Sequence, residues 1–463
     1  VLPCKSVVHK NQFRLKKLTP RLDMRKYTMQ DGTGDIQELD NGSGMAGGTS
    51  SLSKEVQQEI VISPADDVVL MHNVSHSEDT VKQTVQDKST FFQARCFPGL
   101  LITTTLSFSI INLLLFVDWY IRQIIVTPLP SFILTSTFLA AAIITGCLGC
   151  VCVPLLRKLK FKQIFRKEGP VSHLTKMGTP TMGGLYFVPI GLVISSLWTR
   201  HSHLELEVLG AVTVTLAFGA IGLLDDGLSL IRNHNYGLPG WLKLALQVVA
   251  GTCFSCWWDA LDLLPPYKMK MLVPLPAPVG PLYLGKWYLP LTVFCFVAMA
   301  NGINLTDGLD GLAGGTAALA FIGMSIAVIP IYPGLSVFGA SMAGACTGFL
   351  MHNRYKASIF MGDTGSLALG GALAVMASCS GMFLPLFIAS GVFVAETVSV
   401  MVQVVYFKIT KRLHGVGSRL LRMAPMHHHF ELSGVKEPYI IGSAYAISSL
   451  LSLVAAYVGL ISA

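Results

Sequence analysis

Three carboxylates stand out in the sequence because they lie where long apolar runs end or begin. Asp225 and Asp226 end one such run, and Asp363 begins another. Adjacent carboxylates at a membrane interface repel each other and are costly to desolvate unless a divalent cation, a lysine or a proton joins them. A hard oxygen ligand such as Asp363 suits Mg²⁺ that is shared with substrate phosphates. The alternatives are a solvated helix end for the pair and a helix N-cap for Asp363.

Another polar group recurs at a spacing of three, as Asn301, Asn304, Asp307 and Asp310. On a helical path, residues at this spacing share one face. Two amides and two carboxylates on one stripe, beside glycines, predict a polar wall that lines a site. A helix cap would need only one of them.

A glycine-rich loop, residues 178–184, follows Lys176 and contains Thr181. Glycines let a backbone approach a ligand closely, and the helix that follows offers free N–H groups to an anion. The loop therefore predicts an anion contact, although glycine and proline also simply end loops.

Three consecutive histidines, His427, His428 and His429, lie within a basic loop. They cannot all face one ion from a regular element, and no cysteine is close enough to complete a soft-metal site. Their imidazoles could instead hold phosphate or ribose oxygens.

The elements that must position these residues are long apolar segments. Of the 463 residues, 52% are hydrophobic and 13% charged, whereas soluble domains carry about 25% charged residues. Segments long enough to cross a ~30 Å hydrocarbon layer follow one another from residue 98. The pattern predicts an all-α polytopic membrane protein with spans near 98–117, 131–154, 182–198, 207–224, 240–258, 287–303, 311–331, 335–351, 365–380, 382–406 and 439–461. Asp118 closes the first span abruptly.

The polar motifs are expected on one side of the membrane. If each segment spans, the loops 155–181, 225–239, 304–310, 352–364 and 407–438 share a side. Those loops hold sixteen lysines and arginines, against four in the opposite loops. This bias predicts that the first side is cytoplasmic, or stromal in a plastid. An acid-lined cleft on that side that holds Mg²⁺ would serve phosphoryl transfer, which needs charge neutralisation and positioning.

Residues 1–97 differ from the rest of the chain. Six lysines and arginines lie between Lys5 and Arg21 with no acid before Asp23, and a Gly/Ser/Asp/Glu-rich stretch follows. Such a composition predicts a disordered leader with an organelle transit region, or an ordinary disordered tail. No interleaved basic and aromatic stripe indicates nucleic-acid binding, and cysteines within apolar runs predict buried, reduced thiols.

The segments GTPTMGG, LLDDG, NGINLTDGLDGLAGG, FMGDTGSLALGG and RMAPMHHHFEL, in this order, resemble those of the phospho-N-acetylmuramoyl-pentapeptide transferases. These enzymes belong to the polyprenyl-phosphate hexosamine-1-phosphate transferase superfamily. The resemblance covers the chain from about residue 131 to the C-terminus and is specific, since the HHH tract separates this family from its relatives. We therefore expect a leader at 1–97, an extra N-terminal helix at 98–122 and a transferase domain at 131–463.

The resemblance implies ten transmembrane helices, a homodimer and dependence on Mg²⁺. The implied substrates are a UDP-linked muramoyl-pentapeptide and a polyprenyl phosphate, and the implied products are lipid I and UMP. Asp363 resembles the Mg²⁺ ligand, Asp225 the base on the lipid phosphate and Asp226 the acid beside it. The implied substrate-binding residues are Lys176, Thr181, Lys243, Asn304, Leu305, Asp307, Asn353, Phe360, His427, His428 and His429.

The chain also departs from the family pattern. Gly227 stands where an aromatic residue usually follows the acid pair, Ser229 and Tyr236 stand where lysines are common, and Lys356 replaces a usual proline. Because the bacterial pattern lacks the leader and the first helix, we expect a plastid enzyme, with its site facing the stroma at the inner envelope. A bacterial plasma-membrane enzyme is the alternative.

Two other functions remain open. A sister transferase would use UDP-N-acetylglucosamine, against which the HHH context argues. A transporter would place ionisable groups near the bilayer midplane on broken helices, whereas these acids lie at segment ends.

Overall fold

The structure is a computed structural model that describes residues 98–121, 123, 132–159, 176, 178–200, 206–232, 237–261 and 272–463. The predicted leader at 1–97 lies outside the described residues, as does most of the basic loop 155–181. Arg122 and Tyr236 also lie outside them.

Each predicted apolar segment forms a helix, because a chain in hydrocarbon must satisfy its backbone N–H and C=O groups internally. The first helix is Pro98–Ile121. The others are α2 (Ile133–Lys158), α3 (Gly184–Arg200), α4 (Leu206–Arg232), α5 (Gly240–Ala260), α6 (Tyr288–Thr306), α7 (Leu312–Val328), α8 (Pro333–Asn353), α9 (Gly362–Ser380), α10 (Phe383–Ala389), α11 (Gly391–His414), α12 (Met426–Leu432) and α13 (Glu437–Ser462). Seven helices of the described ranges are long and apolar enough to cross a membrane. The predicted all-α polytopic membrane class is confirmed.

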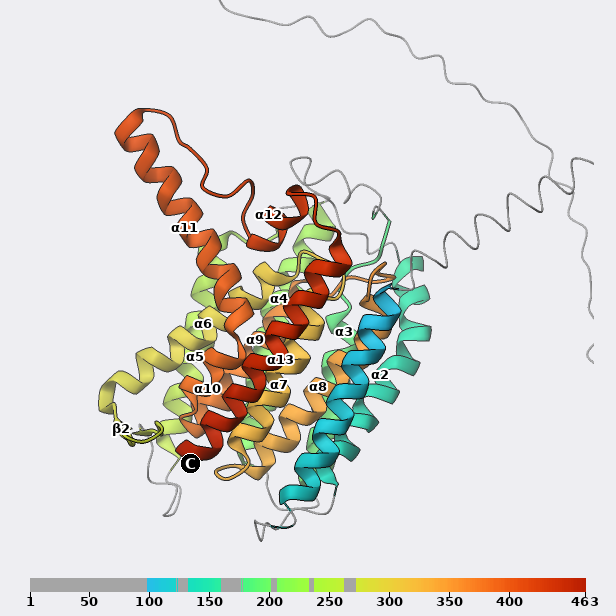
Figure 1. Ribbon diagram of the computed structural model, residues 1–463, viewed down its shortest axis with the longest axis vertical. Helices are drawn as coiled ribbons and strands as arrows, with labels where there is room; N and C mark the ends of the chain where they lie inside the picture. Colours follow the sequence, from blue (N-terminus) through green and yellow to red (C-terminus); the bar gives the residue numbers. More distant parts are fainter. Residues whose placement is uncertain are drawn as a thin grey trace, which may run out of the picture. The chain divides into compact units, whose positions relative to one another are not determined.

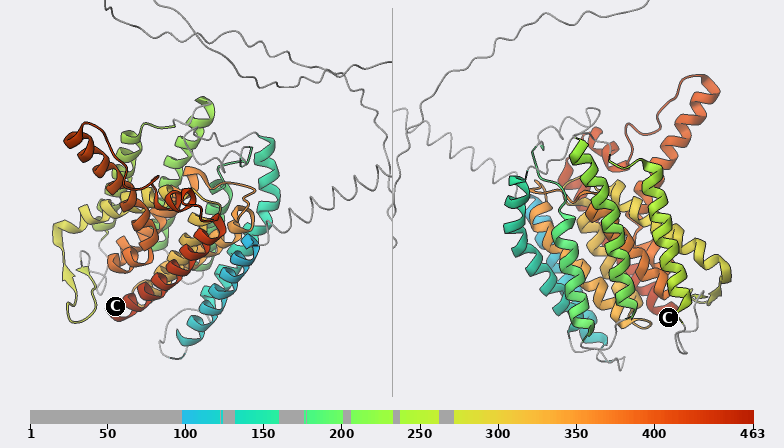
Figure 2. Two further views of the ribbon diagram at one scale, coloured as in Figure 1. Left: turned by 45° about the horizontal axis from the view of Figure 1, so that its top comes forward. Right: turned by 180° about the vertical axis from the view of Figure 1, so that it is seen from behind.

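The predicted span 382–406 is wrong as one continuous helix. The chain breaks between α10 and α11 at Ser390, where the backbone leaves the helical conformation. α11 then runs eight residues beyond the predicted end and extends away from the other helices, before the chain returns to α12 (Figures 1 and 2). The return brings α12, which carries the three histidines, back over the end of the bundle.

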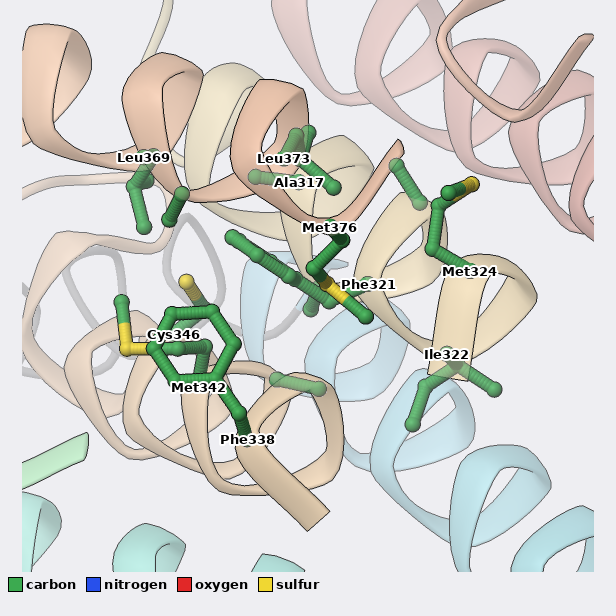
Figure 3. Close-up of a cluster of buried hydrophobic side chains, with 14 of the residues drawn as sticks. Ala317, Phe321, Ile322, Met324, Phe338, Met342, Cys346, Leu369, Leu373 and Met376 are labelled. Carbon is green, nitrogen blue, oxygen red and sulfur yellow. The ribbon is translucent and has the colours of Figure 1, made fainter. Parts of the chain in front are cut away.

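The core is built around α7, in which every residue is buried. A helix that is apolar on all sides is enclosed by its neighbours, and here these include α8, α9 and α13. Figure 3 shows Phe321 of α7 beside Met376 of α9, with Phe338 and Met342 of α8 nearby. Gly339 makes this packing close, because a Cβ there would contact Phe321, Ser325 and Met376.

The N-terminal helix is part of the same bundle. Leu106, Ile110 and Leu114 are buried on one of its faces. Asp118, which the sequence presented as the end of the span, lies inside the helix and accepts hydrogen bonds from the backbone of Leu134 and Thr135. It therefore caps α2, and the extra helix that the sequence predicted is docked against the core.

The two ends of the bundle differ. A two-stranded antiparallel hairpin, β1 (Leu272–Val273) and β2 (Leu282–Tyr283), lies near the C-terminus at one end, and α12 lies at the other (Figure 1). All eight cysteines within the described ranges are free thiols, as predicted. The prediction that they are buried is wrong for Cys147, Cys150, Cys253 and Cys256, which lie on outward helix faces.

Candidate active site

Three acidic side chains from α4 and α9 meet a lysine of α5 at the α12 end of the bundle. Asp225 lies near the end of α4, and Asp363 lies in the first turn of α9. Lys243, in the first turn of α5, joins them, because its Nζ is 2.9 Å from Asp225 Oδ2 and 2.6 Å from Asp363 Oδ2. The lysine thus supplies the positive partner that the paired carboxylates require in an apolar surrounding.

Asp226 has a different environment from its neighbour. Its Oδ1 accepts a hydrogen bond from the backbone N–H of Asp363, and its Oδ2 accepts from the N–H and hydroxyl of Thr364, at 2.7–3.1 Å. These are free N–H groups of the first turn of α9. Asp226 therefore caps α9 from another helix and holds Asp363 in place. Gly222 permits this approach, since a Cβ there would clash with the backbone of Asp363.

Asn304 completes the first cluster from the last turn of α6. Its amide donates to Asp363 Oδ1 at 2.7 Å and to Ser366 Oγ at 3.0 Å. Asp363 consequently has one oxygen bound to a lysine and the other to an amide, with its side chain still 24% exposed. We call Asp225, Asp226, Asp363, Lys243 and Asn304 the acidic cluster.

The expected single polar face over residues 301–310 is wrong beyond Thr306, where α6 ends. Asn301 turns to Gln247 of α5, at 2.7 Å, and belongs to the helix packing. Asp310 lies in the following loop and reaches Lys176 instead. Only Asn304 of the four forms a hydrogen bond to Asp363, because the stripe required a helix that the glycines in this segment interrupt.

A second charged cluster joins the segment at Lys176, the loop after α6 and the start of α13. Lys176 Nζ lies 2.8 Å from both Asp310 Oδ1 and Glu437 Oε1. The same Glu437 oxygen accepts from the backbone N–H of Asp310, and Asp310 Oδ2 accepts from the N–H of Ala357. Burial alone would lower the pKa of Lys176, but the two ion pairs outweigh it and raise the pKa, so the amine stays protonated.

Asp307 lies between the two clusters, just past the end of α6. Burial raises the pKa of its carboxyl to about 7, and the nearby Asp363, Asp226 and Asp310 act in the same direction. The three neighbouring carboxylates add negative charge at this position, which a bound cation would offset. Leu305, two residues earlier in α6, is half-buried.

The glycine-rich loop packs against the segment that carries Asp363. Backbone hydrogen bonds pair Phe360 N–H with Pro180 and Gly183 N–H with Phe360. Gly362 has φ 74° and no room for a side chain, because a Cβ would contact Asp226, Met182 and Thr181. Thr181 and Phe360 therefore lie beside the acidic cluster.

The histidine tract lies over the loop that follows α6. A Cβ at Gly308 would contact the rings of His427 and His428. His427 is buried, and its ring and backbone N–H both lie 3.3 Å from Glu396 Oε2 of α11. His428 pairs with Glu431, while His429 accepts from the backbone N–H of Arg422. The tract thus brings His427 and His428 to the 307–310 loop and turns His429 toward its own chain segment.

Asn353, for which the resemblance implies substrate binding, contacts the loop that precedes Asp363. It is buried at the end of α8, and its amide donates to the carbonyl of Ile359. This bond fixes the loop that leads to Phe360 and Asp363. Its link to the acidic cluster therefore runs through that loop.

The sequence motifs did not identify two acids that lie at the α12 end of the bundle. Glu437 opens α13 and Glu396 lies within α11, so each looks like an isolated charge in the sequence. Their partners are 261 and 31 residues away along the chain. The signal for Glu396 was a single acid in an otherwise apolar span, which in membrane proteins indicates a paired or functional group.

The acidic cluster can hold a divalent cation only together with other ligands. Within the described ranges, no group of three or more His, Cys, Asp and Glu side chains is arranged to bind a metal ion by itself. Asp363 and Asp225 nevertheless direct hard oxygens toward one amine, a donor set that fits Mg²⁺. This ion characteristically keeps waters and takes its remaining ligands from substrate phosphates.

Comparisons with known proteins find a matching family model and similar sequences. The family model Glycosyl transferase family 4 matches residues 208–381, the stretch that includes all three acids of the acidic cluster. A phospho-N-acetylmuramoyl-pentapeptide-transferase of Microcystis aeruginosa is 44% identical over 319 residues, covering 68% of this chain and 86% of that protein. Proteins of the same name from Trichormus variabilis and a Picosynechococcus species are 44% and 47% identical, covering 73% and 67% of this chain and 89% and 82% of theirs.

Proposed function

The chain belongs to the phospho-N-acetylmuramoyl-pentapeptide transferase family, and we propose that its acidic cluster is where this transfer takes place. The enzyme moves phospho-N-acetylmuramoyl-pentapeptide from its UDP carrier to a polyprenyl phosphate, which gives lipid I and UMP for peptidoglycan synthesis. The observation that carries the assignment of the site is the convergence of Asp225, Asp226 and Asp363 with Lys243 at one end of an apolar bundle.

In the reaction, an oxygen of the lipid phosphate forms a bond to the phosphorus attached to the sugar. The bond from that phosphorus to the bridging oxygen of UMP breaks, and UMP leaves. Asp225 is the proton acceptor for a lipid phosphate that arrives as its monoanion, since its carboxylate lies beside Lys243 at the end of a membrane helix. The lysine offsets part of the cost of burying this carboxylate and offers a positive contact for phosphate oxygens.

Asp226 positions Asp363 rather than contacting substrate. Both of its oxygens are occupied by the first turn of α9, so neither is directed at a reacting group. Asp363, oriented by this turn and by Asn304, is the residue that would hold Mg²⁺ with the substrate diphosphate. When bound, the ion would neutralise charge that develops on the phosphate oxygens.

The UDP part of the substrate fits the neighbouring residues. We place it along Asn304, Leu305, Asp307 and the ring of Phe360, with Lys176 at the far side. Glu437 and Asp310 keep the Lys176 amine charged and fixed. His427 and His428 close this region from above the 307–310 loop, where their imidazoles can contact the sugar phosphate.

The direct test is UMP release from the purified full chain with Mg²⁺ and a polyprenyl phosphate. UDP-N-acetylmuramoyl-pentapeptide and UDP-N-acetylglucosamine are supplied as separate donors. We expect release only with the first. Release only with the second would assign the chain to the sister transferases, and solute flux into proteoliposomes without UMP release would favour a transporter.

Glu437→Gln tests the proposed role of the second cluster. Glutamine keeps the oxygen that accepts from Asp310 and Lys176 but removes the negative charge from the contact with Lys176, a loss of about 1.5 kcal/mol. We expect the KM for the UDP donor to rise about tenfold while kcat falls less than about threefold. Glu207→Gln, at the opposite end of α4, is the matched control. A fall in kcat with an unchanged KM would contradict a role in nucleotide binding.

We further propose that the enzyme works as a homodimer in a chloroplast membrane, with the acidic cluster facing the stroma at the inner envelope. The basic, acid-poor leader and the cyanobacterial origin of the relatives support a plastid location. Fusion of residues 1–97 to a fluorescent protein should direct it into plastids. Retention in the cytosol would favour the bacterial plasma-membrane alternative.

Removing residues 1–95 should leave activity in vitro within about twofold, because every contact of the two clusters lies beyond residue 175. The truncation keeps the helix Pro98–Ile121 and its cap on α2. The measurement is UMP release by the truncated and full chains at equal amounts of folded protein. An inactive but folded truncation would place the leader in the catalytic unit.

A further inference from the structure

A cavity of about 900 Å³ lies at the other end of the bundle from the acidic cluster. Its walls come from the last turns of α5, α9 and α13, the first turns of α6, the segment after α7, and β1. β2 and the C-terminus mark this end of the molecule, and α12 marks the other (Figure 1). None of the residues proposed for the transfer reaction lines the cavity, so it is a separate site.

The lining is mostly apolar and aromatic, and its polar groups are Asp259, Lys286 and several hydroxyls. Ser255 Oγ and Thr292 Oγ1 both line the cavity, are buried, and have no hydrogen-bond partner. Thr292 is only 1% exposed. Ser378 and Ser380, which line the same cavity, instead bond to the carbonyl one turn earlier, at 2.8 and 2.7 Å. A buried hydroxyl without a partner is costly, so these two call for an acceptor supplied by a ligand.

The mouth of the cavity has the character of a membrane–water interface. Lys286, on its rim, is exposed, and Tyr283 and Trp287 beside it are 70% and 75% exposed. Tyrosine and tryptophan gather where hydrocarbon meets water. A ligand can therefore enter from the bilayer with its polar end at the level of Lys286.

We propose that this cavity binds one membrane phospholipid. One acyl chain fills the aromatic interior, an ester carbonyl accepts hydrogen bonds from Thr292 and Ser255, and the phosphate lies at Lys286. The volume is within the range of about 300–1,000 Å³ for small-molecule sites. A polyprenyl phosphate shares the chain and the phosphate but has no ester carbonyl for the two hydroxyls, so the phospholipid is the better match.

Occupancy should stabilise the helix that carries Asp363. Ser378 and Cys379, in the last turn of α9, line the cavity, whereas Asp363 lies in the first turn of the same helix. A ligand that binds only the folded protein raises its melting temperature in proportion to the logarithm of its concentration. At about 100 times the dissociation constant, we expect a rise of roughly 5 °C.

Crosslinking maps the site directly. The full chain in detergent is irradiated with a phosphatidylglycerol that carries a diazirine on one acyl chain, and the modified peptides are identified by mass spectrometry. We expect crosslinks on residues 254–260, 288–292 and 378–381. Thr292→Trp, which fills the cavity, should reduce them at least about fivefold. The matched control is Thr213→Trp, on the exposed face of α4.

Lys286→Glu tests the phosphate contact at an exposed position where the fold is not at risk. It should reduce crosslinking by phosphatidylglycerol about fivefold and leave crosslinking by an equivalent diacylglycerol unchanged. Unlabelled phosphatidylglycerol should compete with the probe better than a polyprenyl phosphate does. Equal crosslinking in the two Trp variants, crosslinks spread over all lipid-facing helices, or stronger competition by the polyprenyl phosphate would each overturn the proposal.

Discussion

Asp363→Asn is expected to lower UMP release at least about 10³-fold, the largest effect of any single change in the acidic cluster. The substitution keeps the size of the side chain and an oxygen for the amide of Asn304, which lies 2.7 Å from the carboxylate. It removes the negative charge that pairs with Lys243 at 2.6 Å and that we propose to hold Mg²⁺. The measurement is the initial rate of UMP release with saturating donor and lipid.

Added Mg²⁺ separates a lost ligand from a weakened one. If Asp363 only raised the affinity for the ion, activity would return as Mg²⁺ is increased to about 100 times its usual concentration. We expect no such recovery, because the carboxylate also fixes where the ion meets the substrate diphosphate. The melting temperature should stay within about 3 °C of wild type, which excludes unfolding as the cause. Near-wild-type turnover would contradict the assignment of Asp363 to the active site.

The membrane helices were predictable because each corresponds to a continuous apolar segment of the sequence. α7 shows this best: it is apolar on every side, and the structure encloses it completely. The break at Ser390 was not predictable, since Gly391 and the apolar residues around it resemble an unbroken span. At the break the chain packs closely against α13, because a Cβ on Gly391 would contact Leu451.

The acids of the acidic cluster were identifiable because they lie in the motifs LLDDG and FMGDTGSLALGG, which resemble those of the family. Glu437 carried no such signal. A single glutamate at the start of a helix is common, since it favours the helix dipole, and its lysine partner lies 261 residues away. Likewise, the sequence placed Asp225 and Asp226 together but could not say which oxygen of which acid faces the start of α9. Those assignments depend on how the helices cross.

Asp225→Asn and Asp226→Asn should differ in their response to pH. The two residues are adjacent on α4, so their side chains diverge by about 100° and reach different partners. Asp225 faces Lys243, whereas Asp226 caps α9. If Asp225 accepts the proton of the lipid phosphate, its loss matters most where that phosphate is a monoanion, below its second pKa of about 6. We expect Asp225→Asn to lose about 10²–10³-fold at pH 5.5 and to recover most of that loss by pH 8.

Asp226→Asn should instead be impaired by a similar factor at every pH. Its amide would present an NH₂ group to the N–H groups of Asp363 and Thr364, which now donate to Asp226 at 3.1 and 2.9 Å. Losing a helix cap costs about 0.5–2 kcal/mol, so this variant should also melt several degrees below Asp225→Asn. The measurements are initial rate against pH with saturating Mg²⁺ and the melting temperature of both variants. Parallel pH profiles would end the assignment of Asp225 as the base, because an acid that acts only through its charge gains nothing when the lipid phosphate ionises by itself.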